Sequence, residues 1–121
     1  MTRQSLTEKR MTDELERGRQ QLLSDPSHKL LSNLRRKLQS ITRNIYVINW
    51  IPEQAEDLYD VLVDGTSVVH IEVPRDARTD DVVFEKFGIE EYLKRRHGKP
   101  DRRKLELALR LAQRVGRVSE A

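Results

Sequence analysis

Positively charged side chains gather around one point of the chain, close to residue 98. The segment from 94 to 104 holds seven of them: Lys94, Arg95, Arg96, Lys99, Arg102, Arg103 and Lys104. Such side chains neutralise phosphates and release counterions from a nucleic acid, which gives salt-dependent binding with little sequence preference. We therefore predict a nucleic-acid-binding site, for DNA or RNA, in a small non-catalytic regulatory protein. The alternative is a solvated surface that balances acidic residues elsewhere.

A second basic cluster, expected to add phosphate contacts, consists of Arg35, Arg36 and Lys37. The net charge of the 121 residues is only +3, but it is unevenly distributed. Residues 1–43 carry a net +5, residues 44–91 carry −9 and residues 92–121 carry +7. This asymmetry supports a second hypothesis, a protein-interaction module that docks its acidic central segment on a basic partner. An adaptor, an antitoxin or an immunity-type inhibitor would fit that description.

Acidic residues on a predicted hairpin form another candidate site. Asp57 and Asp60 lie on one expected strand, and Glu72 lies on the next. The pattern resembles the core of the PD-(D/E)xK nucleases, in which an Asp and a Glu of neighbouring strands bind a divalent cation. The resemblance implies Asp60 or Asp57 as one ligand and Glu72 as the other, but Pro74 stands where that family has its lysine. A degenerate metal-dependent nuclease is therefore a third hypothesis.

Other catalytic and cofactor sites have little support in the sequence. There are no cysteines, which excludes disulfides, thiolate metal sites and a cysteine nucleophile. His28, His70 and His97 are far apart, and none has a histidine partner three or four residues away. The five glycines form no phosphate-binding loop. We expect no cofactor, no metal and no catalytic residue.

The spacing of apolar residues predicts an α+β fold. A three-stranded antiparallel meander is expected over residues 44–51, 57–63 and 67–73, packed against N-terminal and C-terminal helices. Asp64-Gly65 marks the turn of the second hairpin, because glycine adopts a positive φ readily. Residues 82–87 fit either a helical turn or a short fourth strand.

The hairpin is expected to have one core face, made of Leu58, Leu62, Val69, Ile71 and Val73. Alternation places Asp60 between Leu58 and Leu62, and a buried carboxylate is costly unless it is paired or ligated. On the preceding strand, Tyr46, Ile48 and Trp50 share a face. That face could stack nucleic-acid bases, but packing under a helix is the favoured interpretation.

The order of helix, three antiparallel strands and helix is similar to that of the double-stranded RNA-binding domain. The residues at the position of that family's phosphate clamp are Lys99, Arg102, Arg103 and Lys104. About 27 residues separate the third strand from the last helix, which is a departure from the family pattern. The resemblance is one of topology only, and topology does not by itself imply function.

Helical spacing predicts helices over residues 5–23, 25–42, 89–97 and from Pro100 onward. Asp25 and Pro26 are expected to start the second of these. The first helix has a sparse apolar stripe, so residues 1–24 are expected to be mobile alone and residues 25–121 to form the folded core. A homodimer through this first helix is one way to order it.

The length of 121 residues favours a single domain spanning 1–121. The N-terminal residues are polar and have no apolar core of a secretory signal. The longest apolar stretch, residues 45–51, is too short to span a bilayer. We therefore expect a cytoplasmic protein without a membrane partner.

Overall fold

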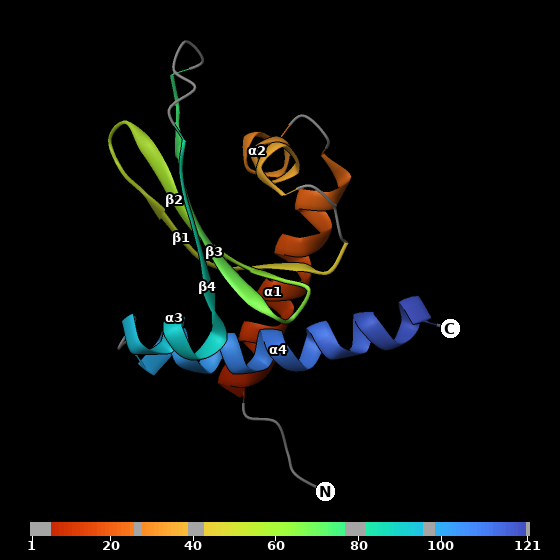
Figure 1. Ribbon diagram of the computed structural model, residues 1–121. Coiled ribbons are helices and arrows are strands. Elements are labelled where there is room, and N and C mark those ends of the chain that lie inside the picture. The colour runs from red at the N-terminus through yellow and green to blue at the C-terminus, as the bar shows by residue number, and fades with distance from the viewer. Residues whose placement is uncertain (1–5, 26–27, 39–42, 77–81, 96–98, 121) are drawn as a thin grey trace, which may run out of the picture.

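The sheet at the centre of the fold has four antiparallel strands in the order β1-β2-β3-β4. The computed structural model describes residues 6–25, 28–38, 43–76, 82–95 and 99–120 (Figure 1). The elements in chain order are α1 (Leu6–Ser24), α2 (Lys29–Lys37), β1 (Ile45–Pro52), β2 (Glu56–Val63), β3 (Ser67–Pro74), β4 (Val83–Gly88), α3 (Ile89–Arg95) and α4 (Lys99–Glu120). The α+β class is confirmed.

The expected number of three strands is wrong, because residues 83–88 form β4 alongside β3. Val68, Val69 and Ile71 of β3 are fully buried. Buried backbone N–H and C=O groups need hydrogen-bond partners on both edges of a strand. β2 supplies one edge and β4 the other, so the run that was ambiguous in the sequence takes the strand conformation.

Helices cover the sheet on both faces. The cluster that joins one face to α2 and the end of α1 contains Leu22, Leu30, Leu31, Leu34, Ile45, Val61, Val63, Val69, Ile71 and Val73. The cluster that joins the other face to α1, α3 and α4 contains Leu15, Tyr46, Ile48, Leu62, Val68, Tyr92, Leu105, Leu107, Ala108, Leu111 and Ala112. Accordingly, α2 and α4 are well separated in Figure 1, and α1 contributes to both clusters.

The expected core face of the β2–β3 hairpin mixed residues from the two faces. In the structure Val61 pairs with Val69, whereas Leu62 pairs with Val68. Directly paired residues of antiparallel strands share a face of the sheet. Leu58 and Leu62 therefore lie on one face, and Val69, Ile71 and Val73 lie on the other. The cause is the turn: Val63 pairs with Ser67, so three residues form the connection, whereas the expected grouping of faces corresponds to a connection of two. One extra residue exchanges the faces.

A β-bulge in β1 separates the two aromatic residues that were expected to share a face. The register shifts between Val47 and Asn49, so Ile48 is the extra residue. Tyr46 pairs with Leu62 and is fully buried, as expected for a core residue. Trp50 instead points to the other face and is 60% exposed, so its expected packing under a helix is wrong.

Helices α1, α3 and α4 begin within one residue of the expected positions, whereas α2 begins at Lys29, four residues after Asp25. The N-cap of α2 is His28, whose Nδ1 accepts a hydrogen bond from the backbone N–H of Leu30, and not Asp25. This helix ends at Lys37, and the expected residues 39–42 lie outside the described part of the chain, as does Pro26. Within the described ranges, none of the helices combines the length and apolar character needed to cross a bilayer.

The core on both faces of the sheet predicts that truncation of Leu62 strongly reduces stability. Leu62 is fully buried in the cluster that joins the sheet to α1, α3 and α4. We expect Leu62→Ala to lower the free energy of unfolding by about 2–5 kcal/mol, because it removes apolar contacts and leaves a cavity. Urea denaturation measures the change. The control is Leu6→Ala at an exposed position, expected to change stability by less than about 0.5 kcal/mol. Equal effects of the two substitutions would contradict this packing.

Candidate functional site

The carboxylate of Asp60 lies in the middle of the sheet and is only 2% exposed. One oxygen is 2.7 Å from His70 Nδ1. The other oxygen accepts a hydrogen bond of 2.9 Å from the Tyr92 hydroxyl and one of 3.2 Å from Asn49 Nδ2. The expectation that Asp60 lies on a buried face of its strand is confirmed. Among its hydrogen-bond partners are a histidine, a tyrosine and an asparagine, and these could not be chosen from the sequence.

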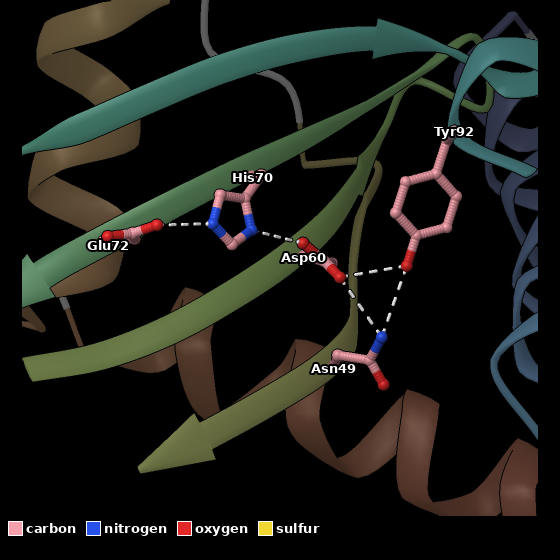
Figure 2. A network of polar contacts seen from close by, with 5 residues as sticks. All are labelled: Asn49, Asp60, His70, Glu72 and Tyr92. Atoms are coloured by element: carbon pink, nitrogen blue, oxygen red, sulfur yellow. Dashed lines mark hydrogen bonds and ion pairs between the residues drawn. The ribbon is translucent and has the colours of Figure 1, made fainter. Parts of the chain in front are cut away.

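The register of the sheet brings this polar group together. Asn49 pairs with Asp60, Asp60 with His70, and His70 with Glu85, so the four residues form one row across β1 to β4. We call them the polar row. The bulge at Ile48 is what brings Asn49 into register with Asp60. Tyr92 of α3 reaches the row from the helical layer (Figure 2).

His70 is held between two carboxylates. Its Nδ1 faces Asp60, and its Nε2 lies 2.8 Å from Glu72, two residues along the same strand (Figure 2). Burial by itself lowers the pKa of His70, but the hydrogen bonds to Asp60 and Glu72 outweigh it and raise the pKa above the ordinary 6.5. A protonated imidazole donates from both nitrogens and therefore satisfies both carboxylates at once.

A cavity of about 240 Å³ adjoins this group. The residues that line it are Asp60, His70, Glu85, Phe87, Tyr92 and Arg95. The guanidinium of Arg95 lies over the ring of Phe87, 4.8 Å from its centroid. Among the described residues of the basic segment, Arg95 is the one that lines this cavity beside the polar row.

Asp60 and Glu72, the residues suggested by the nuclease resemblance, do lie on the same sheet face. The His70 ring lies between them and hydrogen bonds to both. Among the described residues, no group of three or more His, Asp or Glu side chains is arranged to hold a metal ion. Asp57, the alternative ligand, pairs with Arg75 at 2.9 Å. The nuclease hypothesis stays a prediction.

The predicted nucleic-acid site at 94–104 falls on α3 and the start of α4. Lys94, Arg95, Arg102 and Arg103 are exposed. Arg102 forms an ion pair of 3.6 Å with Glu106, and Lys104 forms one of 3.8 Å with Glu14 of α1. Such surface pairs contribute little free energy and are easily exchanged for phosphate contacts. Arg96 and the side chain of Lys99 lie outside the described part of the chain.

The second basic cluster, Arg35, Arg36 and Lys37, forms the exposed last turn of α2. Because α2 covers one face of the sheet and α3 and α4 cover the other, the structure does not bring the two basic clusters together. Arg36 donates a hydrogen bond to the Asn33 side chain of its own helix. The cluster therefore belongs to a separate surface.

Two further arginines of α4 extend the basic surface beyond the predicted segment. Arg103, Arg110 and Arg114 are all exposed. At about 100° per residue, positions 103, 110 and 114 fall within roughly 40° of one another around the helix axis. We call these three residues the arginine stripe, and none of them has an ion-pair partner among the described residues. Their i, i+7, i+11 spacing was the signal available in the sequence.

Comparisons with protein-family profiles, with curated proteins and with solved structures found no match to this chain.

The raised pKa of His70 predicts how stability depends on pH. The group contributes its full stabilisation below the unfolded pKa of about 6.5 and loses it as the pH rises through the folded pKa. The free energy of unfolding of the native protein should therefore fall as the pH rises above about 6.5. His70→Gln should remove most of that slope. Urea denaturation at several pH values measures it.

The matched control is His28→Gln, which leaves the polar row in place and should keep the slope. The account of His70 fails if the native protein and His70→Gln show the same dependence on pH.

Proposed function

We propose that this protein is a non-catalytic module that binds the phosphate backbone of nucleic acids through α4. The observation that carries the proposal is the arginine stripe, which presents three exposed guanidinium groups on one side of a single helix. Arginine is suited to phosphate because its planar guanidinium can donate two parallel hydrogen bonds.

The dimensions of the stripe suit a polymer of phosphates. Positions 103 and 114 are separated by about 16 Å along the helix axis, from a rise of 1.5 Å per residue. Duplex DNA carries one charge per about 1.7 Å of its axis, so several phosphates lie within that reach. The exposed Lys94 and Arg102 add positive charge on α3 and at the start of α4.

The acidic side chains of the sheet do not neutralise this surface. Among the described residues, the ion pairs of α4 are with Glu14 of α1 and with Glu106 of α4 itself, and both acidic partners belong to helices. The stripe is therefore available to an anionic partner. Because binding of this kind reads charge and not base edges, the proposal covers both DNA and RNA.

Removal of the arginine stripe tests the proposal. We expect the triple variant Arg103→Gln, Arg110→Gln and Arg114→Gln to lose most of its affinity for duplex DNA. If each arginine neutralises one phosphate, the slope of log K against log salt should become shallower by about 2.7. Fluorescence anisotropy with a labelled duplex at several salt concentrations gives both quantities.

The matched control replaces Arg35, Arg36 and Lys37 with Gln, which removes the same number of charges from the other side of the sheet. That variant should keep most of its affinity and salt slope. An equal loss in both variants would show that net charge alone drives binding, and no measurable binding by the native protein would end the proposal.

A further inference from the structure

In the part of the chain that the structure describes, one end of a sheet face is partly exposed. The helical layer covers a row of paired residues that consists of Tyr46, Leu62, Val68 and Phe87. The polar row is the next row on this face, on the side toward Pro52 of β1. The next row on the same face consists of Ile51, Leu58, Glu72 and Val83. Ile51 is 42% exposed and Val83 is 43% exposed. We call this last row the outer row.

Three of the four residues of the outer row are apolar, and carboxylates border the row. Glu72 lies within the row, Glu85 belongs to the polar row on one side, and Glu56 pairs with Pro74 on the other. Neither Glu56 nor Glu85 has an ion-pair partner among the described residues. A large exposed apolar side chain is common when isolated, but an apolar row of this kind with a charged border is typical of a docking surface.

We infer that the outer row binds a basic amphipathic helix of a partner protein. A helix is the element that continues the existing layer, because α1, α3 and α4 already cover the same face up to the polar row. The row spans three strand spacings, or about 14 Å, which accommodates the roughly 10 Å width of one helix. This inference is independent of nucleic-acid binding, since it depends on a different surface.

The charge of the border selects among possible occupants. Glu56 and Glu85 attract Lys and Arg side chains at the rim of an apolar contact, as in other complementary interfaces. A phosphate backbone would be repelled by the same carboxylates. A second copy docked by a two-fold axis would place this acidic border against itself. A basic partner helix is the occupant that satisfies both the apolar row and its border.

A synthetic peptide tests the inference directly. The probe is a helical peptide of Leu and Lys whose leucines form one face, and the comparison peptide has Glu in place of every Lys. NMR titration of the 121-residue protein should show shifts of the Ile51, Leu58 and Val83 amides with the Lys peptide and not with the Glu peptide. The affinity should also weaken as salt is raised, because the border contributes by charge.

Two variants separate the apolar and charged contributions. One double variant combines Ile51→Ser with Val83→Ser, and the other combines Glu56→Gln with Glu85→Gln. Each should weaken binding of the Lys peptide at least tenfold. All four positions are at least partly exposed, so both variants should fold. The matched control, Glu90→Gln with Glu91→Gln on α3, removes the same charge away from the row and should bind as the native protein does.

Several outcomes would overturn the inference. These are no binding of the Lys peptide, equal binding of the Glu peptide, shifts confined to residues outside the outer row, or equal losses in the border variant and the α3 control. Self-association that disappears in Ile51→Ser with Val83→Ser would identify a second copy of the chain as the occupant. Analytical ultracentrifugation over a range of concentrations measures that association.

Discussion

The carboxylate of Asp60 is the constraint on which the centre of the sheet depends. A charged group that is almost entirely buried is tolerated only when hydrogen bonds replace the water that it has lost. Those bonds come from β1, β3 and α3, through Asn49, His70 and Tyr92. The bulge in β1, the register of the β2–β3 hairpin and the position of α3 must therefore all agree for Asp60 to be satisfied. This places a polar boundary across an otherwise apolar sheet face.

That boundary divides the molecule into regions of different chemistry. On one side of it, Leu62, Val68 and their neighbours are buried by helices whose described outer surfaces include the arginine stripe and Lys94. On the other side, Ile51 and Val83 are partly exposed and carboxylates border the row. The uneven charge of the sequence thus becomes a spatial separation of positive and negative side chains. The proposed nucleic-acid surface uses the positive ones, and the proposed docking surface uses the negative ones.

Much of the architecture could be predicted from the sequence, because helical and strand periodicities are local properties. The α+β class, the helices and the burial of Asp60 all follow from them. The faces of the hairpin and the orientation of Trp50 could not be predicted, since each depends on a single extra residue, one in the turn after Val63 and one at Ile48. The arginine stripe had a sequence signal in its spacing, whereas the partners of Asp60 depend on contacts between distant elements and had none.

The most direct test of the polar row is an NMR titration of the imidazole nitrogens of His70. If Asp60 and Glu72 hold the ring as the structure shows, His70 titrates with a pKa above the ordinary 6.5, and both nitrogens are protonated at pH 6. A pKa at or below 6.5, with a neutral ring at pH 6, would contradict the arrangement at the centre of the sheet.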